Sequence, residues 1–149
     1  MIRFTILSLL AILILTACGG APAAPTSDPT AAVKSVAGEY FVQLTPQDLE
    51  LAGLTDPDLA NTLGLWVFSF TEDGKLKGML NGSEVGTGAF GFNGNEMIIG
   101  VDRCENCGCE KNHGRYSWAT DGKQLVLKEI YDLCDSMAFI LTAKPLLRR

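Results

Sequence analysis

Short runs of alternating hydrophobic and polar residues dominate the chain from about residue 37 onward. Turn-forming dipeptides separate these runs, which is the pattern of a chain built from β-strands. One polar piece, Thr45–Leu51, instead predicts a short helix, with Thr45 as its cap and Pro46 at its first position. The predicted strands cover Gly38–Leu44, Gly64–Phe70, Lys75–Leu80, Glu84–Phe92, Glu96–Val101, Arg115–Thr120, Lys123–Ile130 and Ser136–Thr142.

The connections between these runs predict how the strands pair. Asp-Gly or Asn-Gly stands in four of the seven connections, and these dipeptides favour tight antiparallel hairpins. Eight antiparallel strands joined in this way close into an up-and-down barrel, which leaves no free sheet edge. We therefore predict an all-β fold with one short helix in the first long connection. A sandwich of two four-stranded sheets is the alternative.

Aromatic residues recur on one face of several predicted strands. In Gly64–Phe70 they stand at every second position, and the same spacing recurs in Arg115–Thr120. A barrel of eight strands can be filled by such side chains or can hold one small ligand, and the sequence leaves both options open. The residues expected to point inward, and to face any ligand, are Trp66, Phe68, Phe70, Tyr116, Trp118 and Phe139.

The N-terminus has the layout of a secretory signal. Arg3 precedes an apolar stretch from Phe4 to Leu15, and small residues then lead to Cys18. The string Leu15-Thr16-Ala17-Cys18 resembles the lipobox of bacterial lipoprotein precursors. The resemblance implies cleavage before Cys18 and acyl chains, such as palmitate, on this residue. These chains would anchor the protein to the extracytoplasmic face of a membrane in the cell envelope. An ordinary secretory peptide and an uncleaved anchor are the alternatives.

The segment after Cys18 is rich in proline, alanine and threonine and contains no aromatic residue. Such a composition cannot bury enough apolar surface to offset the entropy of ordering, so we expect a disordered tether. The predicted organisation is a signal peptide over residues 1–17, a lipidated cysteine and linker over residues 18–36, and a barrel domain over residues 37–149.

Several motifs within residues 37–149 resemble small secreted lipocalin-like (calycin-type) domains. They are Gly64-x-Trp66 at the start of a strand, the run Gly114-Arg115-Tyr116-Ser117-Trp118, then Asp121-Gly122, Leu125-x-Leu127 and Asp132-x-Cys134. The nearest group is bacterial lipoproteins with a stand-alone domain of this type. The resemblance implies a β-barrel with an internal ligand cavity and no catalytic residues. Met137 departs from the pattern, because lipocalin-like domains commonly place an arginine there that packs on the early tryptophan.

Four cysteines remain in the domain, namely Cys104, Cys107, Cys109 and Cys134. An even number in an exported domain indicates disulfides, and four cysteines allow three pairings. In an up-and-down barrel, alternate connections lie at the same end. The connection that contains Cys134 therefore lies at the same end, or rim, as the one that contains the other three cysteines. We prefer the pair Cys109–Cys134 together with a local Cys104–Cys107 bond. The alternative is a Zn²⁺ or Cu(I) site formed by Cys104, Cys107, Cys109 and His113.

Charge and residue counts narrow the functional classes. A net charge of −5 and a pI near 4.8 argue against nucleic-acid binding, which needs a basic surface. The chain has one histidine and no phosphate-binding glycine motif, so we predict that it is not an enzyme and needs no cofactor. The leading hypothesis is a membrane-tethered barrel that binds or carries a small apolar ligand. The alternatives are a filled barrel that binds a protein partner, and a metal-binding lipoprotein.

Overall fold

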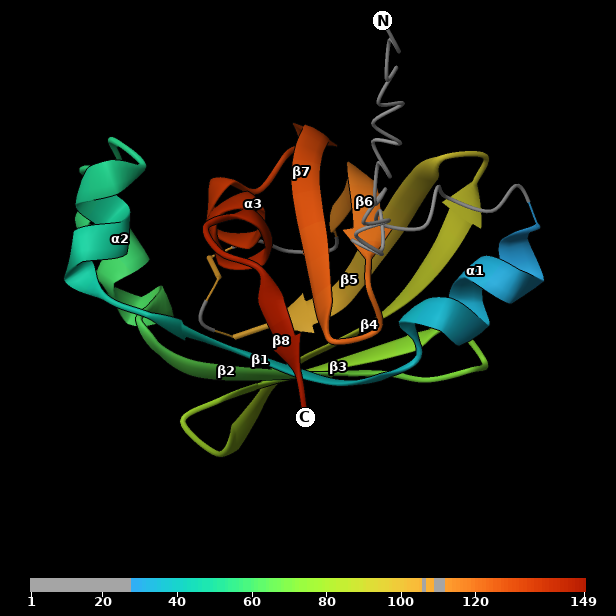
Figure 1. Cartoon of the computed structure of the whole chain (residues 1–149). Coiled ribbons are helices and arrows are strands. Elements are labelled where there is room, and N and C mark those ends of the chain that lie inside the picture. Colours follow the sequence, from blue (N-terminus) through green and yellow to red (C-terminus); the bar gives the residue numbers. More distant parts are fainter. Residues whose placement is uncertain (1–27, 106, 109–111) are drawn as a thin grey trace, which may run out of the picture.

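The strands form a closed antiparallel barrel in which each strand pairs with its neighbours in sequence and β1 pairs with β8. A computed structural model describes residues 28–105, 107–108 and 112–149 (Figure 1). The predicted all-β fold, an eight-stranded up-and-down barrel with a short helix after the first strand, is confirmed.

The strands occupy most of the positions that the alternation predicted. Three of them, β1, β2 and β3, have the predicted bounds, whereas β4, β5, β6 and β7 differ from prediction by one to three residues at their ends. The strands are β1 (Gly38–Leu44), β2 (Gly64–Phe70), β3 (Lys75–Leu80), β4 (Ser83–Asn93), β5 (Glu96–Cys104), β6 (Asn112–Thr120), β7 (Gln124–Asp132) and β8 (Leu146–Arg148). The helices are α1 (Pro29–Val36), α2 (Pro46–Leu51), the 3₁₀-helix η1 (Pro57–Thr62) and α3 (Asp135–Thr142).

The β3–β4 hairpin shows why the turn dipeptides predicted the pairing so well. Asn81 and Gly82 have φ angles of 52° and 86°. Two consecutive residues with positive φ match the twist of the flanking strands, and asparagine and glycine adopt this conformation with the least strain. The side chain of Asn81 also accepts a hydrogen bond from the backbone of Leu65 at 3.0 Å, which links the turn to β2.

The last predicted strand, Ser136–Thr142, is wrong. Residues Asp135–Thr142 form helix α3, and the barrel is closed instead by the shorter strand β8. The five consecutive residues from Met137 to Leu141 are all buried, which a strand with one solvent-facing side could not achieve. A short apolar run of this kind does not distinguish a strand from a buried helix. Phe139 is therefore buried on a helix and not on a barrel strand.

The expectation of a tether up to residue 36 also differs from the structure. Residues Pro29–Val36 form helix α1, and the Asp28 carboxylate caps it by accepting hydrogen bonds from Thr30 and Ala31. Ala32 and Val36 are fully buried. The helix lies against β4 and leads into β1 at the end of the molecule opposite α2 (Figure 1). The folded body thus begins before residue 37.

Stacked and edge-to-face aromatic rings fill the barrel from one end to the other. Trp66 stacks on Phe68 with ring centroids 5.5 Å apart, and Phe70 meets Phe90 edge-on at 5.1 Å. Further contacts continue through Phe92 to Trp118. Each such pair stabilises the fold by about 0.5–1.5 kcal/mol beyond the burial of its surface. The core is therefore a continuous aromatic column with few gaps.

Candidate functional site

The rim is the end of the barrel at which β1–β2, β3–β4, β5–β6 and β7–β8 are connected. The long connections at the rim carry α2, η1 and α3, whereas the opposite end has short turns and α1. The meander predicted this grouping, because alternate connections of an up-and-down barrel lie at the same end. The rim is where the chain departs from regular strands and forms grooves.

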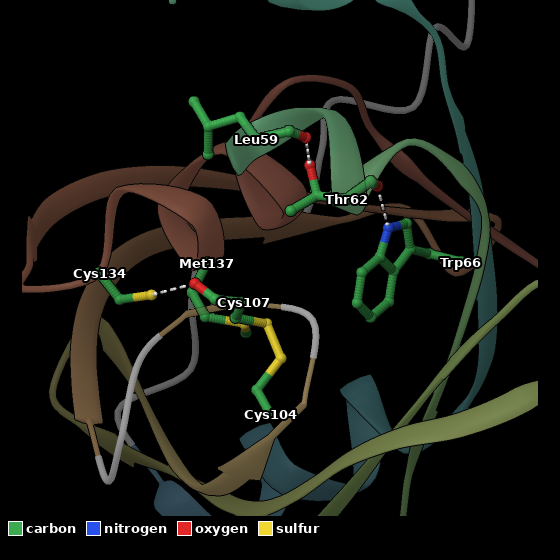
Figure 2. The surroundings of a disulfide bond; sticks show 7 residues. All are labelled: Leu59, Thr62, Trp66, Cys104, Cys107, Cys134 and Met137. Carbon is green, nitrogen blue, oxygen red and sulfur yellow. Dashed lines mark hydrogen bonds between the residues drawn. A yellow bond between two sulfur atoms is a disulfide. The ribbon is translucent and has the colours of Figure 1, made fainter. Parts of the chain in front are cut away.

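Trp66 joins the barrel interior to the rim. Its indole Nε1 donates a hydrogen bond of 2.7 Å to the carbonyl oxygen of Thr62, at the end of η1 (Figure 2). The Thr62 hydroxyl in turn donates to the carbonyl oxygen of Leu59 at 2.6 Å. All three residues are buried. The ring thus holds η1 against the mouth of the barrel.

Sulfur-containing side chains gather beside α3 at the rim. Cys104 and Cys107 form a disulfide. The Cys107 Sγ atom lies 3.3 Å from the Met137 Sδ atom, and the Cys134 Sγ atom lies 3.9 Å from the Cys107 carbonyl oxygen (Figure 2). Cys134 is therefore near the cysteine-containing connection, as the meander predicted. Cys109 lies outside the described residues, so the Cys109–Cys134 pairing stays a prediction.

The residues proposed as the alternative metal site do not form such a site in the part of the chain that the structure describes, and one of them, Cys109, lies outside that part. His113 lies on β6 and is exposed to solvent. Cys104 and Cys107 share a disulfide, and a sulfur in a disulfide is a poor metal ligand. Among the described residues, no group of three or more histidine, cysteine, aspartate or glutamate side chains could hold a metal ion.

Among the residues that the structure describes, a gap of about 20 Å³ lies inside the barrel. Trp66, Phe68, Met137, Gly78 and Gly86 are among the residues that line this gap. Met137, which stands where lipocalin-like domains commonly have an arginine, thus lines the same gap as Trp66 with an apolar side chain. The five strand residues expected inside the barrel, Trp66, Phe68, Phe70, Tyr116 and Trp118, are all at least nine-tenths buried. A gap of this size holds about one water molecule, whereas ligand pockets measure roughly 300–1,000 Å³.

A partly buried hydrogen-bond network links the end of β7 to β6 and to the start of α3. The Tyr116 hydroxyl and the Asn112 amide both donate to the carboxylate of Asp132, which also accepts from the Cys134 backbone at 2.8 Å. Burial and the hydrogen bond to Asp132 raise the pKa of Tyr116 far above its ordinary value. Gly114 lies so close that an added Cβ would clash with the Tyr116 hydroxyl at 2.6 Å. Any larger residue at this position would therefore displace side chains of the network.

A second polar contact fixes α2. The Asp48 carboxylate accepts hydrogen bonds from the Thr45 backbone and hydroxyl at 2.8 and 2.7 Å, and from the Lys144 ammonium at 2.7 Å. Lys144 also donates to the Gln43 carbonyl oxygen at 3.1 Å. The hydrogen bond from Lys144 lowers the pKa of Asp48, against the opposing effect of burial. This contact joins α2 to the segment between α3 and β8.

A groove of about 430 Å³ is lined by residues of helices α2 and α3, and we call it the α2–α3 groove. Buried or half-buried apolar side chains, which include Leu54, Ala138 and Phe139, form its floor. Leu51 borders it and is 80% exposed. Glu129 from β7 and Asp135 from α3 also line the groove, and both are exposed.

The charges of this groove are only partly compensated. Lys144 pairs with Asp48, but within the described ranges neither Glu129 nor Asp135 forms an ion pair. On the outer wall of β2–β5, by contrast, a groove of about 570 Å³ contains Lys75 and Lys77, which pair with acidic neighbours at 2.7 and 2.6 Å. An exposed leucine beside two carboxylates without such ion pairs distinguishes the α2–α3 groove from this wall.

Sequence reasoning did not find the α2–α3 groove. Its two helical walls come from positions almost 90 residues apart, and the α3 wall was predicted as a strand. The exposed apolar residues Ile130, Tyr131 and Leu133 could have indicated the region, because they break the alternation at the end of β7.

Comparison with protein-family models, with curated proteins and with solved structures gives no match for this chain. In the part that the structure describes, no helix has both the length and the apolar character needed to cross a bilayer. The closed barrel is an architecture that can hold a small ligand and is compatible with a lipocalin-like fold. The function must therefore be inferred from the filled interior and the rim.

Proposed function

We propose that this protein is a lipid-anchored, non-catalytic binding module of a bacterial cell envelope. In this proposal Cys18 carries the acyl chains, and the rim of a lipocalin-like barrel binds a protein partner. The observation that favours the rim over the interior is the difference in available space. The interior gap measures about 20 Å³, whereas the α2–α3 groove measures about 430 Å³.

The position of α1 supports an orientation of the anchored protein. About ten residues separate Cys18 from the start of α1. Ten residues span at most about 35 Å when fully extended, so the α1 end would stay near the bilayer. The rim is at the other end of the barrel (Figure 1). An anchored molecule would thus present its grooves away from the lipid.

The anchor is tested by replacing Cys18 with serine. The variant is expected to lose acylation and either to remain unprocessed or to leave the membrane fraction, which mass spectrometry and cell fractionation would show. A mature-length Cys18→Ser protein that stays with the membrane would contradict the lipid anchor.

The use of the rim is tested by photo-crosslinking in the native cells. A photoreactive residue in place of Leu51, which is 80% exposed on the rim, should form a discrete adduct with a protein. The matched control is Leu147, which is 45% exposed on β8. Equal labelling from both positions, or none from Leu51, would contradict a binding role for the rim.

A second candidate function, the binding of a small apolar ligand inside the barrel, is favoured by one observation. The interior gap has apolar walls, and Gly78, Gly86 and the flexible side chain of Met137 border it. Movement of Met137 would enlarge the gap without exposing a polar group. Native mass spectrometry of the purified protein tests this candidate, because a carried lipid or other apolar ligand would add a defined mass. A spectrum of the bare chain favours the filled barrel.

A further inference from the structure

The α2–α3 groove combines an apolar floor with an acidic border. Leu54, Ala138 and Phe139 contribute to the floor, and Glu129 and Asp135 contribute exposed carboxylates. Its volume of about 430 Å³ is within the range of sites that take up a small molecule or several side chains. An occupant that matches this groove must carry both apolar and positively charged groups.

Exposed apolar side chains also occur in the segments that supply the groove's lining. Leu51 borders the groove and is 80% exposed, and Leu133, two residues before Asp135, is 69% exposed. Ile130 and Tyr131, which directly follow Glu129, are 48% and 44% exposed. Several exposed apolar side chains in the segments that line a groove are typical of protein–protein contact, whereas a small ligand needs only the groove itself.

Two other occupants fit the charges less well. The surface of an anionic bilayer would be repelled by Glu129 and Asp135, and α1 leads into the barrel at the opposite end. A second copy joined through the same groove by a twofold axis would bring the carboxylates of both copies together. Like charges in contact cost several kcal/mol at an interface.

From the charge and apolar character of this groove, we infer that it binds a basic, amphipathic segment of a protein partner. Apolar side chains of that segment would occupy the floor, and lysine or arginine side chains would pair with Glu129 and Asp135. This inference rests on the proposed function, because it specifies the chemistry of the partner that the rim binds.

The probe for this inference is a synthetic amphipathic helix of about 14 residues, made of leucine and lysine at helical spacing. Its acidic counterpart has glutamate in place of every lysine. Binding of each peptide to the full chain in mild detergent is measured by calorimetry. We expect the basic peptide to bind and the acidic peptide to show no binding.

Charge variants test whether the groove itself is the site. The double variant Glu129→Gln/Asp135→Asn should weaken binding of the basic peptide by about tenfold, the effect of losing two exposed ion pairs. The matched control is Glu39→Gln/Glu72→Gln, which changes the net charge equally but lies near the opposite end. This control should change the affinity less than about twofold.

An apolar variant tests the floor and border independently of charge. Leu51→Ser should weaken binding about fivefold, and its fold should be unaffected because the side chain is 80% exposed. Leu147→Ser, at the opposite end, should leave the affinity unchanged. Circular dichroism of each variant verifies that the barrel is intact.

Four results would overturn the inference. Equal weakening by both double variants would show that the peptide responds only to the net negative charge. Equal binding of the acidic peptide would show that charge does not select the partner. A dimer of the chain that Leu51→Ser dissociates would assign the groove to a second copy. An adduct at Leu51 in cells, combined with no binding of the basic peptide, would leave the proposed function standing and refute only the basic partner.

Discussion

Truncation of Trp66 is the most direct test of the connection between the barrel and its rim. The ring is 1% exposed, stacks on Phe68 and donates a hydrogen bond to the carbonyl oxygen of Thr62. Trp66→Ala leaves a cavity in the aromatic column and a buried carbonyl without its donor. We expect the fold to become less stable without changing its topology.

The expected loss of stability follows from the cavity and from the missing hydrogen bond. Removal of a buried tryptophan side chain costs about 3–5 kcal/mol, and a lost hydrogen bond adds about 1 kcal/mol. For a domain of this size, each kcal/mol lowers the melting temperature by roughly 3–5 °C. Trp66→Ala should therefore lower it by about 12–30 °C.

The assay is thermal and urea unfolding of the full chain, followed by circular dichroism. Trp66→Phe retains an aromatic ring but loses the bond to Thr62, so it should cost about 1–2 kcal/mol. Leu147→Ala, in which an exposed side chain is shortened, should stay within about 0.5 kcal/mol of the parent. A melting temperature of Trp66→Ala within about 2 °C of the parent would refute the conclusion that Trp66 packs inside the barrel and supports η1.

Three further predictions concern the rim and its supports. Replacing Cys104 and Cys107 together by serine should cost about 2 kcal/mol in urea unfolding, as expected for a bond that closes a short loop, and a chelator should have no effect on the parent. Asp48→Asn should be less stable than the parent by about 1–3 kcal/mol at neutral pH. Because the folded-state pKa of Asp48 is lowered, its contribution is present above about pH 4 and is lost at more acidic pH, so urea midpoints should converge there. Gly114→Ala should cost about 1–3 kcal/mol in thermal unfolding because its Cβ would clash, whereas Gly91→Ala, with open space around the added atom, should cost less than about 1 kcal/mol.

The sequence by itself determined the first seven strands and the pairing between them, since both depend on local chemistry. Alternating side chains place one face of each strand inward, and Asn81-Gly82 favours the backbone conformation that a tight hairpin needs. The bounds of β2 and of helix α2 followed from the same local signals. Helix α1 also has a local start signal, with Asp28 as its cap and Pro29 at its first position. The proline-rich composition around it instead led to the prediction of a disordered tether.

Only the tertiary structure decided the conformation of residues 135–142 and the use of the barrel interior. The apolar run from Met137 to Leu141 can bury its side chains as a strand or as a helix, and the helix is formed because η1 and β7 provide apolar surface on its sides. Whether the aromatic rings leave a cavity depends on how they pack together, which no alternation pattern specifies. The α2–α3 groove arises only when two segments distant in the sequence meet at the rim, so its acidic and apolar character became visible only in the folded chain.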